Sequence, residues 1–231
     1  MKWLGKAFDF EAGSILNFNK PKGRTSFWVV KQVRKLIKTK VGHSGTLDPF
    51  ATGVLLICTG KATKQVSELM NLPKHYIGEI ELGITTNTDD LTGEILKKRQ
   101  IPDLTIEQIR EICQSFIGDI YQLPPMFSAK KIKGRRLYKL ARAGKVIERK
   151  PNLVHIEQIE VLSFSSPVIK IKVECSKGTY MRSLARDIGE KVGCGAHLKS
   201  LVRTQIGPYQ LEDSLTIEDF DQMLEEINAL K

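Results

Sequence analysis

The sequence predicts an α+β fold built around a largely antiparallel sheet. Apolar and charged residues alternate at 169–175, the pattern of a half-buried strand, whereas apolar residues recur at helical spacing after Ser26 and Thr105. These strands and helices follow one another without the regular alternation of a parallel doubly wound sheet. The 231 residues are enough for one large domain or two small ones.

The first 82 residues are expected to contain three strands and one helix. The strands are indicated at residues 15–19, 53–60 and 76–82. A turn at Lys20-Pro21-Lys22-Gly23 follows the first strand. Ser26 is a candidate N-cap for the helix, in which Val29, Val33 and Ile37 lie on one face. Residues 42–49 are expected to form a loop rich in glycine.

The remaining elements follow from capping and spacing. Thr105 and Gln108 form a capping-box pattern, so a helix should run to about Ile117 and end at Gly118. A short helix is expected at 137–143 on a projecting arm, another helix at 180–192, and an edge strand at 201–206. Thr216 is expected to cap a final helix.

The positive charge of the chain is concentrated in one segment. The formal net charge is +10, and residues 130–150 contain ten Lys/Arg against one acid, Glu148. The remainder holds 26 basic and 25 acidic residues. A dense basic segment favours a polyanionic partner, because each neutralised phosphate releases counterions. The alternative is a solvated basic surface without a ligand.

Several classes of protein are disfavoured. No apolar run approaches the roughly 18 residues of a membrane span, and the N-terminus lacks the apolar region of a secretory signal, so we expect a cytoplasmic protein. The four cysteines are scattered, and with the histidines they form no metal-ligand spacing. The segment at Gly60-Lys61 does not match the phosphate-binding loop motif. Leu55 stands where that motif needs Gly, and Ala62 stands where it needs Ser or Thr.

The segment GHSGTLDPFATG, from Gly42 to Gly53, is the first candidate for chemistry. Its glycines allow a ligand to approach the backbone closely, and Pro49 stiffens the chain directly after Asp48. A carboxylate held rigidly in this way can act as a covalent nucleophile. The alternative is an Asp that only stabilises the turn through its own backbone, and spacing alone leaves both open.

The second candidate is SKGTYMR, residues 176–182, between the clearest strand and a helix. Tyr180 and Arg182 stand at the helix start, where backbone N–H groups favour anions. Arg182 can pair with a carboxylate such as Asp48, and Tyr180 can stack on a base. Tyr76 is a further stacking candidate beside basic residues. A surface arginine and packed tyrosines are the simpler alternative.

Together these segments resemble the bacterial tRNA pseudouridine-55 synthase (TruB) family over almost the whole chain. NKPKGRTS at 19–26 resembles the opening KPxGxTS motif, and residues 42–53 with ATK at 62–64 resemble the nucleophile motif. TNTDD at 86–90, PPMFSAK at 124–130 and GTYMRSL at 178–184 resemble three later blocks in the right order. Asn87 departs from the Asp of many members, which should be tolerable if Asp90 is the acid that matters.

The resemblance implies a pseudouridine synthase fold with an RNA-gripping arm at about 124–151. It implies one catalytic domain over residues 1–231, without the C-terminal PUA-type domain of many members. Asp48 matches the essential aspartate, His43 the residue that displaces the target uridine, and Asp90 a second acid. Arg182 matches the arginine paired with the aspartate. The other uridine-pocket residues implied are Tyr76, Tyr180 and Leu201. The arm residues expected to bind RNA phosphates are Lys130, Lys131, Arg135, Arg136 and Arg142.

The implied reaction converts uridine to pseudouridine in the T-arm of tRNA, at position 55, after the base is flipped out. Attack by Asp48 on ribose C1′ and attack on uracil C6 both remain open. The rearrangement needs no metal, nucleotide or redox cofactor, and we expect a monomer. Two other classes are a non-catalytic RNA-binding or RNA-folding protein, and a hydrolase that releases free uracil.

Overall fold

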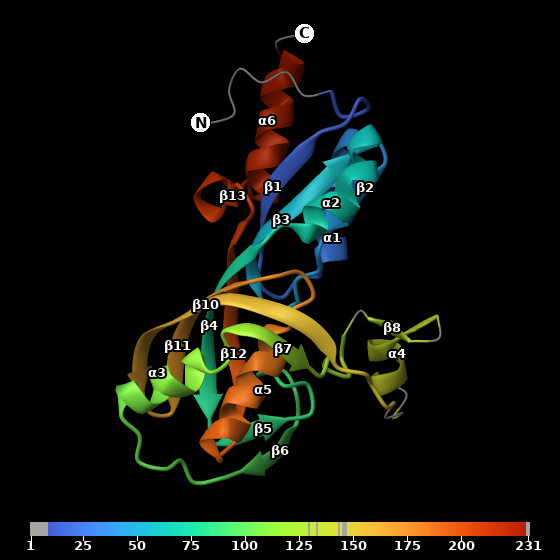
Figure 1. The fold of residues 1–231 in the computed structure, drawn as a ribbon. Helices are drawn as coiled ribbons and strands as arrows, with labels where there is room; N and C mark the ends of the chain where they lie inside the picture. The colour runs from blue at the N-terminus through green and yellow to red at the C-terminus, as the bar shows by residue number, and fades with distance from the viewer. Residues whose placement is uncertain (1–8, 129, 133, 143, 145–146, 230–231) are drawn as a thin grey trace. The chain divides into compact units, whose positions relative to one another are not determined.

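The computed structural model describes residues 9–128, 130–132, 134–142, 144 and 147–229. The chain divides into two compact units, the first comprising Met1–Lys74 with Val202–Lys231 and the second His75–Leu201. Figure 1 colours the chain by residue number, so the first unit holds the blue and red ends and the second the segments between them. Within the described residues, no helix is long and apolar enough to cross a membrane.

The first unit is organised around strand β3. Its partners β1 and β2 run antiparallel to it, and β12 pairs with it in parallel through Val202 and Arg203. The strands are β1 (Ile15–Lys20), β2 (Val41–Ser44), β3 (Thr52–Thr59), the end of β12 (Ala196–Ile206) and β13 (Tyr209–Gln210). The helices are α1 (Ser26–Ile37), α2 (Val66–Asn71) and α6 (Ile217–Ala229), with 3-10 turns η1 (Gly60–Gln65) and η2 (Leu211–Asp213).

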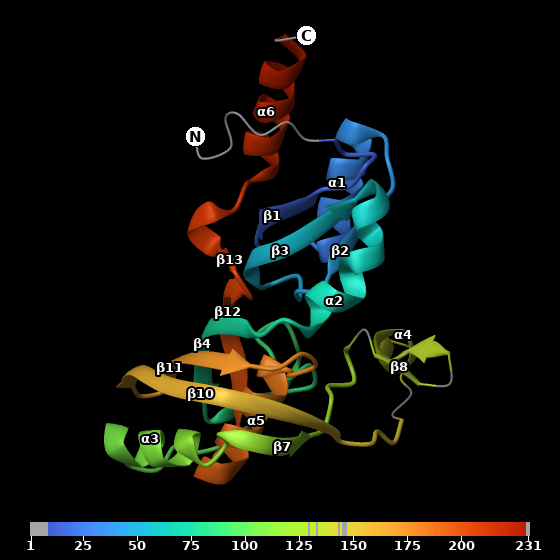
Figure 2. The ribbon, with the colours of Figure 1, turned by 45° about the horizontal axis from the view of Figure 1, so that its top comes forward.

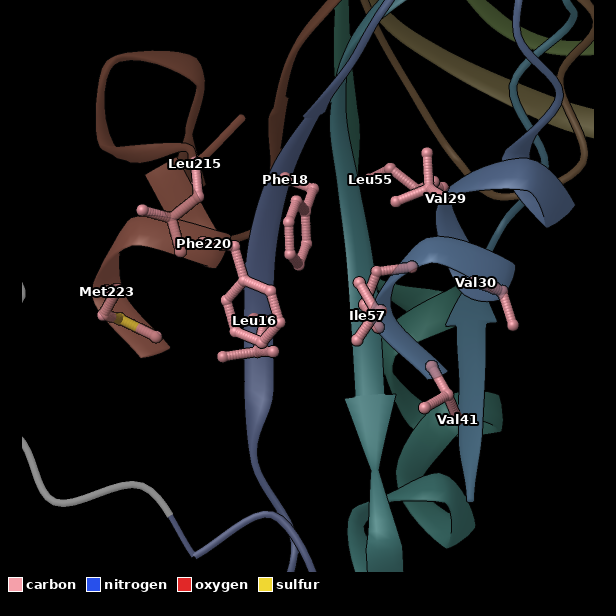
Figure 3. Close-up of a cluster of buried hydrophobic side chains, with 11 residues drawn as sticks. Leu16, Phe18, Val29, Val30, Val41, Leu55, Ile57, Leu215, Phe220 and Met223 are labelled. Carbon is pink, nitrogen blue, oxygen red and sulfur yellow. The ribbon is translucent and has the colours of Figure 1, made fainter. Parts of the chain in front are cut away.

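A buried apolar cluster joins α1 and α6 to the same sheet (Figure 3). Phe18 of β1 contacts Phe220 of α6 edge to face, with ring centroids 5.3 Å apart. Val29 and Val33 of α1 are fully buried at the spacing of one helical face. A second cluster, around Val54 and Leu56, packs on η1 and α2. The sheet is therefore covered on both faces, which explains why β3 is an unbroken apolar run.

The second unit holds strands in the order β12, β4, β11, β10, β7. Helix α3 packs on β10 and on α5, and Figure 2 shows β8 and α4 lying to one side of these strands. The strands are β4 (Lys74–Leu82), β5 (Ile84–Thr86), β6 (Ile95–Lys98), β7 (Gly118–Gln122), β8 (Lys131–Ile132), β9 (Arg135–Arg136), β10 (Asn152–Ser165) and β11 (Val168–Cys175). The helices are α3 (Ile106–Gln114), α4 (Leu137–Arg142) and α5 (Met181–Val192).

The predicted α+β class and its mostly antiparallel pairing are confirmed. The strands at 15–19, 53–60, 76–82 and 169–175 are present, as are the helices after Ser26, Thr105, Tyr180 and Thr216. Both halves of the capping box at Thr105 and Gln108 form. A short helix α4 lies within the expected arm, although Ala143, at its expected end, lies outside the described residues.

Four details of the prediction are wrong. The N-cap of α1 is Thr25, whose hydroxyl accepts from the Trp28 N–H, while Ser26 is the first helical residue. The expected loop at 42–49 begins as strand β2, and α3 ends at Gln114 rather than near Ile117. The expected edge strand at 201–206 is part of β12, which has neighbours on both sides. Strands β7 and β10 were not foreseen.

Candidate active site

The loop that carries Asp48 joins β2 to β3 in the first unit. Leu47 and Phe50, on either side of Asp48, are buried and fix the loop to the core. The buried Ser26 hydroxyl accepts from the Leu47 N–H at 2.9 Å and donates to the Leu47 carbonyl at 3.1 Å. The carbonyl of Asp48 itself accepts from the Ala51 N–H at 3.1 Å. These bonds fix the backbone around Asp48, whose side chain is partly buried.

Lys20, the last residue of β1, brings a buried ammonium to this loop. Its side chain is 0% exposed, and Nζ donates to three backbone carbonyls, among them that of Pro49 at 3.3 Å. Three acceptors match the three donors of an ammonium. Burial lowers the pKa of Lys20 to about 8, while the negative charge of Asp48 acts to raise it and the charge of Arg203 to lower it. Lys20 therefore sets a cation beside the candidate nucleophile.

Arg203 of β12 is a second buried cation at the loop, 2% exposed. Its Nη2 donates to the Gly45 carbonyl at 3.2 Å and its Nε to the Val54 carbonyl at 2.7 Å, so it bonds on both sides of Asp48. Gly53 has φ +105°, and a Cβ added there would lie 2.2 Å from the Arg203 carbonyl. Only glycine allows β3 to approach β12 this closely.

His43 lies on β2, opposite Ile57 of β3, five residues before Asp48. It is half-buried. The structure thus places His43 and Asp48 in the same unit, at the two ends of a short strand-to-loop segment. The expected role of His43 in displacing the uridine stays a prediction.

Arg182, the second residue of α5, is the centre of the candidate site in the second unit. It is 3% exposed, and its Nη1 lies 3.4 Å from Oδ2 of Asp90, which is 4% exposed. Nη1 also donates to the Thr88 carbonyl at 3.0 Å, and Nη2 to the Phe127 carbonyl at 2.9 Å. The Asp90 Oδ1 accepts from the hydroxyls of Thr88 (2.8 Å) and Thr92 (2.6 Å).

This arrangement agrees with Asp90 as the acid near the arginine. The Asn87 side chain bonds to Glu94, and its Oδ1 accepts from the Glu94 N–H at 3.0 Å. The departure from the family pattern at 87 therefore leaves the Arg182–Asp90 pair intact. Asp48 and Arg182 belong to different units, and their expected pairing stays a prediction.

The remaining pocket candidates lie on three elements of the second unit. Tyr76 and Gly78 occupy the same face of β4, being two residues apart. A Cβ added at Gly78 would lie 3.5 Å from Leu201 Cδ1, so Leu201 of β12 lies beside this face. Tyr180 is the N-cap of α5, and its N–H donates to Gln122 Oε1 at 2.7 Å. Tyr76 and Leu201 are buried, 8% and 6% exposed.

The base of the arm is fixed to α5 by bonds to backbone carbonyls. Ser183 Oγ and Arg186 Nη2 both donate to the Leu123 carbonyl, at 2.8 and 3.2 Å. Arg149 Nη1 donates to the Pro124 carbonyl at 2.8 Å, which joins the two ends of the arm. Arg186 in turn pairs with Asp89 at 3.1 Å.

The arm residues expected to bind phosphates are described only in part. The Lys130 ammonium donates to Asn152 Oδ1, and Arg135 is exposed. The side chains of Lys131, Arg136 and Arg142 lie outside what the structure describes.

Thiol and metal chemistry find little support in the described residues. Burial raises the pKa of the Cys58 thiol to about 11 and that of Cys113 to about 12, which leaves both protonated at neutral pH. No group of three or more His, Cys, Asp or Glu side chains within the described ranges has the arrangement of a metal site.

Comparison with known families decides the class. A model described as the N-terminal domain of TruB family pseudouridylate synthases matches residues 33–181. The chain belongs to the TruB family. A second model, the C-terminal domain of tRNA pseudouridylate synthase B, matches residues 182–230. The resemblance found in the sequence motifs is thereby confirmed. The expectation of one domain over 1–231 without a PUA-type domain stays a prediction.

TruB relatives match over nearly the whole chain. The tRNA pseudouridine synthase B of Phocaeicola vulgatus is 48% identical over 225 residues, which are 94% of this chain and 96% of the relative. That of Parabacteroides distasonis is 48% identical over 230 residues, 96% and 97% of the two chains. That of Francisella philomiragia is 47% identical over 224 residues, 94% of this chain but 74% of the longer relative.

Solved structures agree with the TruB assignment. A chain in a Cbf5-Nop10-Gar1 complex is similar with a TM-score of 0.72 and 30% identity, over 92% of this chain and 54% of that one. A chain of an H/ACA RNP bound to a substrate RNA containing 2'-deoxyuridine gives 0.68 and 28%, over 92% and 53%. This chain spans about half the length of both. The expected pseudouridine synthase fold is confirmed.

Two residues that bond to the Asp48 loop, Lys20 and Arg203, were not singled out from sequence. Lys20 stands inside the KPxGxTS motif, but the motif predicts a turn there and gives no sign that the ammonium is buried. Arg203 bonds to carbonyls 149 and 158 residues away in the chain. Backbone acceptors carry no residue-type signal, so no sequence pattern marks this contact.

Proposed function

We propose that this chain isomerises uridine to pseudouridine in the T-arm loop of tRNA, at position 55, with Asp48 as the nucleophile. Membership of the TruB family supports the reaction, and the names of the relatives support tRNA as the substrate. The observation that carries the assignment of Asp48 is its loop, fixed by Ser26 and set beside the buried cations Lys20 and Arg203.

The reaction conserves the elemental composition of the nucleotide, with one proton exchanged. The bond between ribose C1′ and uracil N1 breaks, the uracil turns, and C1′ joins C5. The proton leaves C5 and N1 gains one, so the product has the mass of the substrate. Asp48 holds one partner covalently while the base turns, and the base is flipped from the loop beforehand. His43, Tyr76, Tyr180 and Leu201 would hold the extruded nucleotide, with Arg182 and Asp90 as the charged pair of the pocket.

The basic arm would bind the phosphates of the T-arm without selecting sequence. We place this activity in the cytoplasm and assign it to a monomer of 26.0 kDa. Light scattering coupled to gel filtration, with and without tRNA, checks the mass of the free and bound protein.

Tritium release tests the nucleophile. A T-arm transcript labelled at uracil C5 should lose tritium with the wild-type protein and none above background with Asp48→Asn, because an amide is a poor nucleophile. Asp221→Asn, an exposed change on α6 of the same unit, is the matched control and should retain full activity. Tritium release by Asp48→Asn at the wild-type rate would remove the assignment.

Mass spectrometry of the same transcript separates the other classes. The proposed isomerase leaves the RNA mass unchanged while tritium is released. A hydrolase would give RNA lighter by one base together with free uracil. A non-catalytic RNA-binding or RNA-folding protein would change neither mass nor label, and either result would contradict the proposal.

A further inference from the structure

The chain has a second basic segment outside the arm, although its residues outside the arm carry almost no net charge in total. Residues 20–64 contain ten Lys/Arg and one acid, Asp48. They carry as much excess charge as the arm, and acidic residues elsewhere offset them in the total. Nine of the ten are exposed, the exception being the buried Lys20.

Helix α1 gathers part of this charge on one face. Phe27, Lys31, Arg34 and Lys35 recur at helical spacing, and Lys38 follows at the C-cap. All five are exposed, on the side opposite the buried Val29 and Val33. These five residues, Phe27, Lys31, Arg34, Lys35 and Lys38, are here named the α1 basic face.

The α1 basic face is electrostatically unfavourable for the free protein. Lys31–Lys35 and Arg34–Lys38 are like-charge pairs at i, i+4, which destabilise a helix. The helix contains no acid, and no ion pair joins Lys31, Lys35 or Lys38 to an acidic side chain in the described part of the chain. Arg34 and Lys35 complement the C-terminal end of the helix dipole, but Lys31, nearer the middle, gains less from it.

Aromatic side chains are interleaved with these cations. Phe27 is 52% exposed at the N-terminal end of the face, with Lys31 Nζ 5.5 Å from its ring centroid. Arg24, just before the helix, lies over the ring of the partly buried Trp28, at 5.2 Å from its centroid. Exposed aromatics beside cations are typical of surfaces that bind nucleic acid, where rings stack on bases and cations contact phosphates.

The α1 basic face begins next to the Asp48 loop. Ser26, the first residue of α1, holds both backbone groups of Leu47, the neighbour of Asp48. Twelve helical residues extend about 18 Å from that point. An RNA whose uridine is held at Asp48 therefore has a positively charged helix face within reach of its flanking nucleotides.

We propose that the α1 basic face binds the phosphate backbone of the RNA that reacts at Asp48, outside the reacting nucleotide and independently of the arm. This rests on the proposed function for the choice of RNA. The face contributes affinity and orientation of the substrate, while the chemical step depends on the Asp48 loop. Its like charges reduce helix stability in the free protein and are neutralised when RNA binds.

The test compares a triple variant, Lys31→Gln/Lys35→Gln/Lys38→Gln, with a matched control, Lys97→Gln/Lys98→Gln/Lys170→Gln. The control removes three exposed lysines from β6 and β11. For binding of a tRNA transcript, the slope of log affinity against log salt should become shallower by roughly two to three in the α1 variant. Affinity at 150 mM salt should fall at least about tenfold. The control should keep a slope within half a unit of wild type.

Two further readouts separate binding from folding and chemistry. The single-turnover rate at saturating tRNA should equal that of wild type, and the melting temperature should be equal or higher, because repulsion within the helix is relieved. If the triple variant fails to fold, Lys35→Gln against Lys97→Gln decides, with a slope change of nearly one expected for Lys35→Gln alone.

Each outcome bears on the α1 basic face separately from the proposed function. Equal slopes for the α1 variant and its control, with an active wild type, would overturn the α1 proposal and leave the proposed function standing. If wild type is inactive but its salt slope for RNA binding still depends on the α1 lysines, the proposed function is overturned and binding by the α1 basic face stands. A third outcome would also overturn the α1 proposal: the α1 variant binds RNA with the salt slope of wild type but no longer binds the anionic phospholipid vesicles that wild type binds. The α1 basic face would then bind a membrane surface rather than RNA.

Discussion

At the scale of single residues, the surroundings of Asp48 are unusual in placing two buried cations at one loop. Lys20 and Arg203 are 0% and 2% exposed, and both donate to backbone carbonyls, Lys20 to three and Arg203 to two. Buried charge is costly unless it is hydrogen-bonded. The loop thus depends on charged side chains for its shape, and they depend on its carbonyls.

Lys20 should make the free energy of unfolding depend on pH in the alkaline range. Its folded pKa of about 8 lies below the unfolded value near 10.5, so between these pH values the unfolded chain holds a proton that the folded chain has lost. The contribution of this group to stability therefore rises with pH and is lost as pH falls through about 8. Urea unfolding at pH 7.5 and 9.5 should show wild type gaining roughly 2 kcal/mol relative to Lys20→Met.

The outcome that contradicts this is a stability difference between wild type and Lys20→Met that stays constant across that range. Lys61→Met is the control, an exposed lysine of the same unit with no buried environment to lose.

The Asp90–Arg182 pair should be a major stabilising contact of the second unit. Asp90→Ala removes the acid that lies against a buried guanidinium, which costs about 3–5 kcal/mol. Arg182→Met in the same chain should recover part of that loss, because the buried charge that lost Asp90 is then removed as well. Chemical denaturation of the two single variants and the double variant measures the coupling. Strictly additive losses would show that the two side chains do not stabilise each other.

The scale of residues also marks where sequence stops being informative. Ser26 and Thr25 are both good N-caps, and only the structure shows that Ser26 is instead bonded to Leu47. Asp48, Arg182 and Asp90 could be found because the family motifs surround them. Lys20 and Arg203 could not, because their partners are carbonyls of the folded backbone.

At the scale of elements, the arm is anchored at its base and charged along its length. Helix α5 supplies Arg182, Ser183 and Arg186, all donating to carbonyls of residues 123–127. Two of these, Arg182 and Arg186, also pair with the neighbouring acids Asp90 and Asp89. The segment that holds the charged pair of the pocket therefore also holds the arm.

Arg186→Gln should loosen the arm base. It removes the bond to the Leu123 carbonyl and the partner of Asp89, so trypsin should cut within residues 130–150 at least severalfold faster. Arg110→Gln breaks an exposed pair with Glu107 on α3 and is the control, with an unchanged cleavage rate expected. Equal cleavage of both variants would show that Arg186 does not restrain the arm.

Charge along the arm should govern part of the salt dependence of tRNA binding. Lys130 is engaged by Asn152, so the cleaner variant is Lys131→Gln/Arg135→Gln/Arg136→Gln. Its slope of log affinity against log salt should be shallower by roughly two to three, because each of the three lost cations neutralises one phosphate at about 0.7–0.9 per phosphate. The Lys97, Lys98 and Lys170 variant again serves as control. An unchanged slope would count against the arm as an electrostatic contact.

Element prediction succeeded where periodicity was regular and failed where it was interrupted. Strand β11 alternates strictly and was predicted, whereas its partner β10 was missed. Register shifts at Ile156/Gln158 and Val161/Ser163 place two exposed residues in a row on β10, so its apolar residues lose the period of two. Strand β12 was predicted as an edge because neighbours on both sides are a property of the sheet rather than of the strand.

At the scale of the whole molecule, the residues that the TruB resemblance assigns to the uridine are distributed over both units. His43 and Asp48 belong to the first, and Tyr76, Asp90, Tyr180, Arg182 and Leu201 to the second. Helix α1 likewise belongs to the first unit and the arm to the second. Family membership, rather than charge or spacing, is what related these separate segments to one reaction in the sequence.

The balance of atoms in the proposed reaction predicts independence from cofactors. Protein dialysed against EDTA should isomerise a T-arm stem–loop at the wild-type rate, without ATP or a redox carrier. The stem–loop is preferred to whole tRNA because its fold depends less on magnesium. A rate that falls on chelation and returns with a divalent ion would contradict the mechanism.

Nucleotide-resolution mapping of pseudouridine in unmodified tRNA incubated with the wild-type protein tests the central claim most directly. The account predicts one new pseudouridine, in the T-arm loop at position 55, formed by wild type and absent with Asp48→Asn. Pseudouridine in another arm of the tRNA, or none at all from active, folded protein, would contradict it.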